Sequence, residues 1–257
     1  MTLGPAINIS HLTKTYGTTI ALSDVSLTVN PGEVRGLLGL NGSGKSSLMK
    51  TIMGLTKPSY GAIQVLGYDV RISPMDIKKV VGYVPESPRL YEFLTATEYL
   101  DFIADVRGLP YDQKKERIGI FVEALDLEGK QGDMISSYSQ GMKQKVAIIG
   151  ALLHRPRVLL MDEPLNGLDP KSARLVKELI HGLAKEGVSI VFSTHILEIA
   201  EAICDKLTIL QSGKILAEGT SRDLRENAGL PGSGLEEVFL KLTGTKGVED
   251  MVEALIK

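Results

Sequence analysis

Hydrophobic and polar residues alternate with a period of two near the start of the chain. This alternation predicts strands over residues 6–16 and 20–29, and the apolar run over 34–40 predicts a buried strand. Helical spacing of apolar residues follows over 45–55, after a group of glycines. The first part of the chain is therefore predicted to contain strand, glycine-rich loop and helix in that order.

The middle of the chain carries a different pattern. Between about residue 87 and residue 155 little strand pattern is present, and apolar residues recur with helical spacing over 95–107, 111–127 and 141–153. We interpret this block as a mostly helical insertion in an α/β core.

The mixed pattern returns after the helical block. Apolar runs predict further strands, and helical stripes separate them. The expected strands span 158–161, 188–192, 207–210 and 215–217, and the expected helices span 171–185, 195–203, 235–242 and 248–256.

Composition narrows the protein class. The 257 residues are 43% hydrophobic and 23% charged, which is typical of a folded globular protein and not of a disordered one. The net charge of −2 gives no reason to expect a nucleic-acid partner, and the single cysteine, Cys204, excludes an internal disulfide. No apolar run approaches the ~20 residues that a membrane-spanning helix needs, and no secretory signal is visible at the start. We therefore expect a soluble, cytoplasmic chain.

The glycine-rich loop matches the G-x4-G-K-[ST] phosphate-binding motif. Glycines allow successive backbone N–H groups to curve round an anion, and the following helix directs the positive end of its dipole at the same place. Lys45 is expected to add a point charge for the outer phosphates, and Ser46 to offer its hydroxyl oxygen to Mg²⁺. The expected nucleotide-binding residues of this loop are Gly39, Leu40, Asn41, Gly42, Ser43, Gly44, Lys45, Ser46 and Ser47. A glycine-rich turn that matches by chance is the alternative, and the motif alone does not separate ATPases, GTPases and kinases.

Two acids follow a strongly apolar strand. Ligands of open α/β sheets gather at the carboxyl ends of strands, so Asp162 is expected to anchor Mg²⁺ and Glu163 to act as the general base on an attacking water. An acidic helix N-cap after a strand is the alternative. His195 follows the strand over 188–192 in the same way, and its alternative is a residue at a helix start with no ligand.

These pieces together resemble the ATP-binding-cassette (ABC) ATPases over roughly residues 6 to 220. Lys14-Thr15-Tyr16-Gly17 resembles the loop whose aromatic ring, here Tyr16, stacks on adenine. Tyr138-Ser139-Gln140-Gly141-Met142 resembles the family's signature, Asn166-Gly167-Leu168-Asp169 the loop that contacts a partner subunit, and Ser193-Thr194-His195 the segment with the switch histidine. The signature distinguishes this family from other phosphate-loop proteins.

The resemblance implies a fold and a division into parts. It implies a P-loop NTPase core with an N-terminal antiparallel β subdomain and an inserted α-helical subdomain. The core is expected over 1–86 and 156–220, the helical signature subdomain over 87–155, and a C-terminal helical extension over 221–257.

The resemblance also implies the activity and the partners. ATP and Mg²⁺ would bind the chain, and hydrolysis of the ATP would drive transport, with export favoured over import. Ser46, Glu86 and Asp162 would face the metal, and Glu163, His195 and Glu86 would be the catalytic residues. Ser139 and Gly141, at a helix N-terminus, would bind the phosphates of a nucleotide held by a second copy or a related ATPase chain in a head-to-tail dimer. An integral membrane permease would be the other partner, with the chain peripheral on the cytoplasmic face of the membrane.

Two segments depart from the family pattern. Glu86 stands where Gln is usual, and Gln140 and Met142 replace Gly and Gln in the signature. Such variants, and the tail segments over 213–219 and 235–244, resemble the branch paired with the simpler type of exporter. The alternatives are a soluble ABC ATPase serving assembly or repair, a P-loop kinase or GTPase, and a regulatory binder without hydrolysis.

Overall fold

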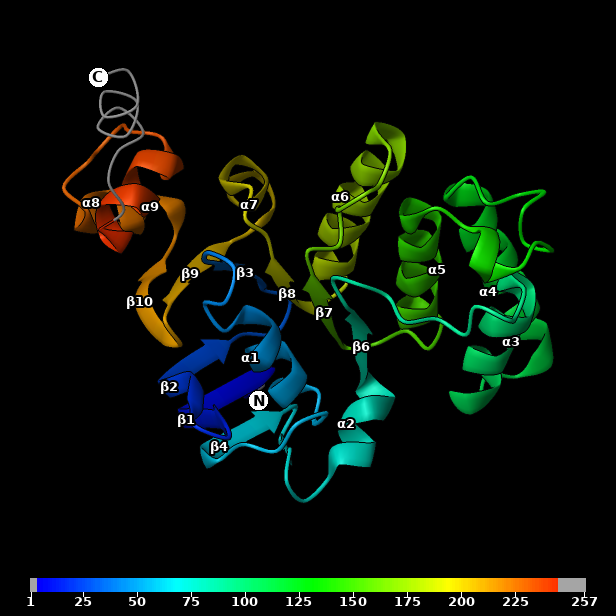
Figure 1. Ribbon diagram of the computed structural model, residues 1–257, viewed down its shortest axis with the longest axis horizontal. Helices are drawn as coiled ribbons and strands as arrows, with labels where there is room; N and C mark the ends of the chain where they lie inside the picture. The colour runs from blue at the N-terminus through cyan, green and yellow to red at the C-terminus, as the bar shows by residue number, and fades with distance from the viewer. Residues whose placement is uncertain (1–3, 245–257) are drawn as a thin grey trace.

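The computed structural model describes residues 4–244 and contains two sheets that flank one helix. The four-stranded antiparallel sheet has the order β2-β1-β4-β5, and the six-stranded sheet has the order β10-β9-β3-β8-β7-β6. All neighbours in the larger sheet are parallel except β9 and β10. The helix α1 lies between the two sheets (Figure 1). The fold is the expected α/β P-loop architecture with an antiparallel sheet.

The strands have the following bounds. The smaller sheet contains β1 (Ile7–Tyr16), β2 (Thr19–Val29), β4 (Tyr60–Val65) and β5 (Tyr68–Asp69). The larger sheet contains β3 (Val34–Leu38), β6 (Val81–Val84), β7 (Val158–Asp162), β8 (Ser189–Ser193), β9 (Lys206–Gln211) and β10 (Lys214–Gly219).

The helices begin and end close to the expected positions where a periodic apolar stripe is present. They are α1 (Lys45–Ile52), α2 (Pro74–Val80), α3 (Ala96–Val106), α4 (Tyr111–Ala124), α5 (Gln140–Leu152), α6 (Pro170–Lys185), α7 (Leu197–Ile203), α8 (Ser221–Asn227) and α9 (Leu235–Thr243). The 3-10 turn η1 (Ile135–Ser137) precedes α5.

Three expected helix bounds need correction. The helix expected over 195–203 begins only at Leu197, because the Thr194 hydroxyl accepts a hydrogen bond from the Ile196 N–H and holds a turn there. The helices expected over 45–55 and 111–127 end at Ile52 and Ala124. The helix expected over 248–256 lies outside the described residues.

Strand β7 shows why the larger sheet is apolar on both faces. Val158 and Leu160 pack with α1 and the antiparallel sheet, whereas Leu159 and Met161 pack with α5 and α6 on the other face. Each of the five residues of β7 is buried. Alternate side chains thus enter two different cores, which explains the continuous apolar run in the sequence.

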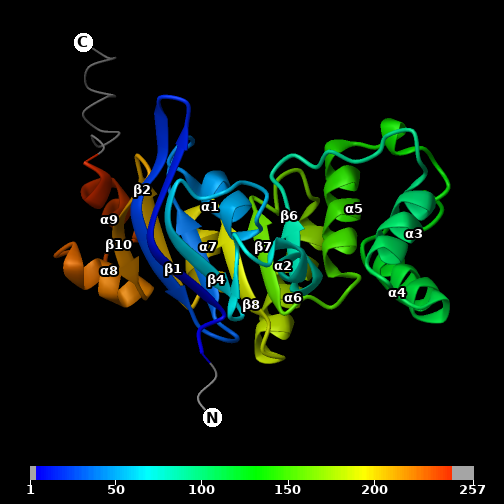
Figure 2. The same ribbon diagram turned by 90° about the horizontal axis from the view of Figure 1, so that it is seen from below.

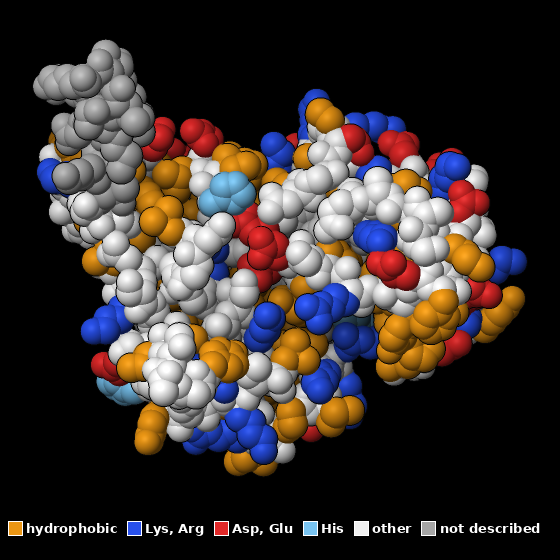
Figure 3. All heavy atoms as spheres, in the orientation of Figure 1, with side chains coloured by type: hydrophobic (Ala, Val, Ile, Leu, Met, Phe, Trp, Pro, Cys, Tyr) orange, Lys and Arg blue, Asp and Glu red, His pale blue; other side chains and the backbone are white. Residues whose placement is uncertain are grey.

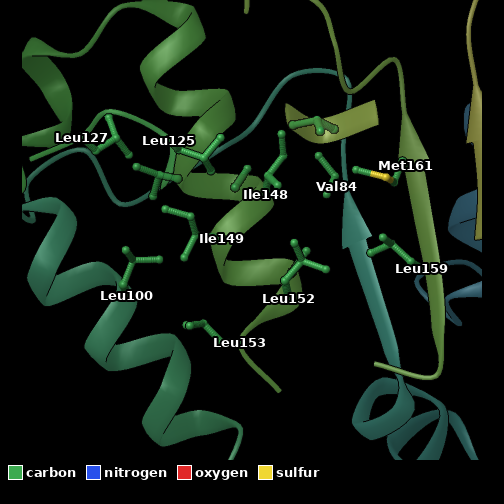
Figure 4. Packing of buried hydrophobic residues seen from close by; sticks show 14 of the residues in the cluster. Val84, Leu100, Leu125, Leu127, Ile148, Ile149, Leu152, Leu153, Leu159 and Met161 are labelled. Carbon is green, nitrogen blue, oxygen red and sulfur yellow. The ribbon is translucent and has the colours of Figure 1, made fainter. Parts of the chain in front are cut away.

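Helix α5 joins the helical block to the sheet. In Figure 4, Ile148, Ile149 and Leu152 lie between the helical block and the strands β6 and β7. Figure 2 shows α3, α4 and α5 at one end of the molecule and α8 and α9 at the other. Helices α8 and α9 pack on β9, β10 and α7 through a separate cluster that includes Leu224, Val238 and Phe239. Helix α1, which follows the phosphate loop, lies between these two ends (Figure 2).

Candidate functional site

The glycine-rich loop forms one wall of a cavity of about 430 Å³. The loop joins the end of β3 at Leu38 to the start of α1 at Lys45. The cavity is lined by Asn41 to Ser47, by Thr19 to Ala21 at the start of β2, and by Glu86, Asp162 and Glu163. Gly39 and Leu40 do not line it. Four segments that are far apart in the sequence therefore meet at this cavity.

Gly44 explains why the loop requires glycine next to its lysine. Gly44 is the N-cap of α1 with φ of +111°, and a Cβ there would lie 2.7 Å from the Ala21 carbonyl oxygen. Any other residue would combine a strained backbone with a collision. The tight turn allows the first N–H groups of α1 to face the cavity, where an anion would be stabilised.

Two side chains of the loop carry donors suited to a phosphate. Lys45 is 7% exposed, and its Nζ donates to the carbonyl oxygens of Gly39 at 2.6 Å and Leu40 at 3.3 Å. The Ser43 hydroxyl is buried and makes no hydrogen bond within the described part of the chain. A buried donor without a partner is unfavourable, so an anion in the cavity would relieve it. The loop therefore fits a phosphate group.

The acidic pair lies at the carboxyl end of β7. Asp162 is 2% exposed and Glu163 is 6% exposed. The backbone of Glu163 has φ of +48°, in the left-handed region that residues with a Cβ rarely adopt. His195 Nδ1 lies 3.0 Å from Glu163 Oε2, while the His195 side chain is 56% exposed. The pairing gives Glu163 a fixed partner on the open side of the site.

Strand β8 supplies a residue that the sequence reasoning did not single out. The Ser193 hydroxyl donates to Asp162 Oδ1 at 2.6 Å and accepts from the Glu163 N–H at 3.0 Å. The signal in the sequence is weak, since it amounts to a polar residue at the end of the apolar run over 188–192.

The residues expected to face Mg²⁺ all supply oxygen atoms. Ser46, Glu86 and Asp162 line the same cavity, and hydroxyl and carboxylate oxygens are the ligands that Mg²⁺ prefers. Within residues 4–244, no three His, Cys, Asp or Glu side chains gather closely enough to hold a metal ion by themselves. Mg²⁺ in nucleotide sites normally takes one or two carboxylates, with phosphates and waters completing the shell. The donor set fits that arrangement.

Tyr83 lies beside these carboxylates on β6. Its hydroxyl is buried without a hydrogen-bond partner among the described residues. Burial, and then the negative charges of Asp162 and Glu86, raise the pKa of Tyr83 far above its ordinary value. The phenol therefore stays neutral beside the acidic edge of the cavity. Figure 3 shows acidic side chains gathered near the middle of this face.

Tyr16 lies at the end of β1 and does not line the cavity. Its ring is 44% exposed, and Lys14 Nζ lies 4.6 Å from the ring centroid while donating to the Lys57 carbonyl oxygen at 2.9 Å. The lysine covers part of the ring by a cation–π contact. Stacking of adenine on Tyr16 stays a prediction.

The signature residues lie apart from the cavity, at the start of α5. Ser139 is the N-cap of α5 and accepts a hydrogen bond from the Met142 N–H at 3.3 Å. A Cβ on Gly141 would lie only 2.2 Å from the Gly167 carbonyl oxygen, so the two backbones are in close contact. Neither Ser139 nor Gly141 lines the phosphate cavity. The signature therefore lies at a helix start that is separate from the phosphate cavity.

An ion pair ties α5 to the loop after the acidic strand. Lys145 Nζ lies 2.9 Å from Asp169 Oδ2, and Gln144 Nε2 donates to the Pro164 carbonyl oxygen at 3.3 Å. Asp169 is also the N-cap of α6, and the hydrogen bonds from Ser172 and then from Lys145 hold the pKa of Asp169 well below its usual range. The signature helix and residues 164–169 therefore form one connected unit.

Comparisons with known proteins agree on the family. The ABC transporter family model matches residues 22–166. The ABC-type transporter ATP-binding protein EcsA of Bacillus subtilis is 36% identical over 237 residues, which are 92% of this chain and 96% of that protein. The Nod factor export ATP-binding protein I of Rhizobium etli is 37% identical over 219 residues, which are 85% of this chain and 69% of that protein.

A solved structure supports the same assignment. The structure of an ATP-binding subunit of an ABC transporter superposes with a TM-score of 0.88 at 37% identity, covering 93% of this chain and 99% of the other. None of the helices between residues 4 and 244 has both the length and the apolar character that crossing a membrane requires. The protein belongs to the ABC transporter family of ATP-binding subunits and is an ABC ATPase.

Proposed function

We propose that this chain hydrolyses ATP to drive a separate membrane-embedded subunit, with export as the direction of transport. The observation that supports hydrolysis is the single cavity shared by the phosphate loop, Glu86, Asp162 and Glu163. Export is supported by the similarity to a Nod factor export ATP-binding protein.

The residues around the cavity divide the chemistry between them. Lys45 leaves the carbonyl oxygens of Gly39 and Leu40 to bind the outer phosphates, where its charge opposes that of the nucleotide. Glu163 accepts the proton of the attacking water, and His195, 3.0 Å from its carboxylate, holds that side chain in place. Bound with ATP through Ser46, Asp162 and Glu86, Mg²⁺ would neutralise phosphate charge. Glu86 adds a negative charge that Gln would not.

The separation between the signature and the phosphate cavity supports a head-to-tail dimer. Ser139 and Gly141 sit at the N-terminus of a 13-residue helix but do not reach the chain's own cavity. In a symmetric pair, each signature helix would face the phosphates held by Lys45 of the other protomer. Two nucleotides would then be enclosed between the chains.

A second cavity is suited to the membrane partner. It has a volume of about 640 Å³ and lies between α1, α2 and β6 on one side and α3 and α5 on the other. Its lining is apolar, with Leu55, Tyr99 and Ile103 among others, and Lys78, Lys79, Arg89 and Arg107 bring positive charge. Basic and hydrophobic side chains gather around this hollow in Figure 3. A short apolar segment with acidic residues is the occupant that this chemistry favours.

The same cavity offers a route from the partner to the nucleotide. Pro85 and Pro88, on either side of the Glu86 loop, line it, and so does Tyr83. Movement of a bound segment would therefore act on the loop that carries Glu86.

Light scattering of purified Glu163→Gln protein tests the nucleotide mechanism. The variant should bind ATP, stall hydrolysis and shift from monomer to dimer on addition of Mg-ATP, since the closed pair would no longer be released. Glu163→Gln/Lys45→Ala is the matched control and should stay monomeric. Undiminished turnover in Glu163→Gln would refute the base assignment. A persistent monomer that still binds ATP would refute a self-sufficient homodimer.

Charge reversal tests the membrane partner. Arg89→Glu changes an exposed residue of the larger cavity, whereas Arg174→Glu changes an exposed residue of α6 that does not line it. Arg89→Glu should lose its co-purification with membranes of the native host, and Arg174→Glu should retain it. If the unmodified chain never co-purifies with a membrane protein, the proposed function as a transporter subunit is wrong, and the alternative, a soluble ABC ATPase, takes its place.

A further inference from the structure

Ser193 connects two residues of the hydrolytic site through one buried hydroxyl. Ser193 is fully buried at the end of β8 and lies directly opposite Asp162 in the parallel pairing of β7 with β8. Its Oγ donates to Asp162 Oδ1 at 2.6 Å and accepts from the Glu163 N–H at 3.0 Å. No other hydroxyl among the described residues contacts both of these acids.

The two hydrogen bonds have separate physical effects. The bond to Oδ1 fixes the rotation of the Asp162 carboxylate and leaves Oδ2 as the oxygen available to a metal-bound water. The bond from the Glu163 N–H supports a backbone conformation with φ of +48°, which a residue with a Cβ seldom adopts without help. The direction of the Glu163 side chain depends on that backbone.

We propose that Ser193 is a positioning residue that holds the Mg²⁺-facing carboxylate of Asp162 and the backbone of Glu163 in a fixed mutual arrangement. The proposal rests on the proposed roles of Asp162 and Glu163. Ser193 is fully buried and does not line the phosphate cavity, so its effect passes through the two acids.

The same strand provides a matched control. Ser189 begins β8, is 1% exposed, accepts from the Gly32 N–H at 3.1 Å and donates to the Asn30 carbonyl oxygen at 3.0 Å. Ser189 and Ser193 thus each donate one hydrogen bond and accept at least one, at opposite ends of one strand. Ser189→Ala and Ser193→Ala remove similar interactions, but only Ser193 contacts residues that line the phosphate cavity.

Metal binding separates a positioning role from a structural one. The experiment uses Mn²⁺ in place of Mg²⁺. In the presence of saturating ADP, Mn²⁺ binding can be followed by electron paramagnetic resonance, and no ATP is hydrolysed. Ser193→Ala should raise the Mn²⁺ concentration for half-saturation by about tenfold, as loss of a group that orients a ligand typically does. Ser189→Ala should leave it unchanged, although urea unfolding should show similar destabilisation of both variants.

Each outcome decides a different claim. Equal shifts in Ser193→Ala and Ser189→Ala, or no shift in Ser193→Ala, would overturn the role of Ser193 while leaving the ATPase assignment intact. Absence of Mn²⁺-dependent ADP binding in the unmodified chain would overturn the proposed site and the role of Ser193 with it.

Discussion

A single methyl group added at Gly141 tests whether the close contact between the signature helix and the loop after β7 matters. The Cβ of an alanine at this position would lie 2.2 Å from the Gly167 carbonyl oxygen and 3.2 Å from the Gly167 carbonyl carbon. Non-bonded atoms prefer about 3.5 Å or more, so the loop or the helix must move by roughly 1 Å. Both contacts involve backbone atoms, which cannot move aside by changing rotamer.

The energetic effect can be isolated with a second variant. Gly119 lies inside α4, and a Cβ there would meet nothing within 4 Å. Gly119→Ala should therefore raise the free energy of unfolding by up to about 1 kcal/mol through helix propensity alone. Gly141→Ala shares part of that gain but adds the overlap, which costs about 1–3 kcal/mol. The difference between the two variants thus combines the overlap with the smaller part of the propensity gain that Gly141→Ala does not share.

Urea unfolding and steady-state ATPase activity of the two full-length variants are the assays. Gly141→Ala should be the less stable by about 1–3 kcal/mol, and its ATPase activity should fall more than tenfold, because the displaced loop carries Asp169 and its bond to Lys145. Gly119→Ala should keep normal activity. If Gly141→Ala and Gly119→Ala were equally stable, or equally active when folded, the close contact between Gly141 and Gly167 would not matter, which would refute this prediction.

Three further predictions concern the nucleotide and pH. Lys45→Ala should weaken ATP binding about 10- to 100-fold, the loss of one charged hydrogen bond, in a fluorescent-nucleotide titration. An unchanged ATPase rate in that variant would remove the phosphate-loop assignment. Tyr16→Ala should weaken ATP binding about 5- to 100-fold by loss of stacking, whereas Tyr16→Phe should bind normally; equal affinities would refute adenine stacking. Burial, and then the charge of Arg107, lower the pKa of His154 to about 4, so the folded protein binds fewer protons than the unfolded chain below pH 6.5. The contribution of neutral His154 to the free energy of unfolding is complete above pH 6.5 and is lost as the pH falls toward 4. His154 should therefore account for about 2 kcal/mol of the stability lost between pH 7.5 and pH 5. Urea unfolding should show a smaller loss in His154→Gln, and an identical loss would contradict the assignment.

The sequence predicted the elements whose apolar residues follow a clear period. The buried run over 158–161 and the helical stripe over 171–185 correspond to β7 and α6. The segment over 60–84 gave no such signal, although it contains β4, β5, α2 and β6. Helix α2 has one buried residue, Ile77, and β6 has four residues in all, so neither is long enough to show a period.

Site residues that belong to a local sequence motif could be predicted, whereas those brought together by strand register could not. The phosphate loop and the acidic pair are local patterns, and they line one cavity in the structure. Ser193 is a serine in a strand, and its contact with Asp162 exists only because β7 and β8 pair in a register that places the two residues opposite each other. Sequence spacing does not determine that register. The functional roles of the individual residues stay predictions until the variants are measured.

At position 163, the backbone is left-handed, so the residue proposed for activity is not the residue that would make the fold most stable. For most residues with a Cβ, this conformation costs roughly 1–2 kcal/mol of stability. Glycine adopts it more readily, and so does asparagine among the residues that have a Cβ. Replacing Glu163 with asparagine should therefore yield a chain that resists heat better, and that hydrolyses no ATP because it lacks the proposed general base. A thermal selection applied without an activity screen would enrich inactive chains at this residue, so engineering of heat-resistant forms of this protein must hold position 163 constant.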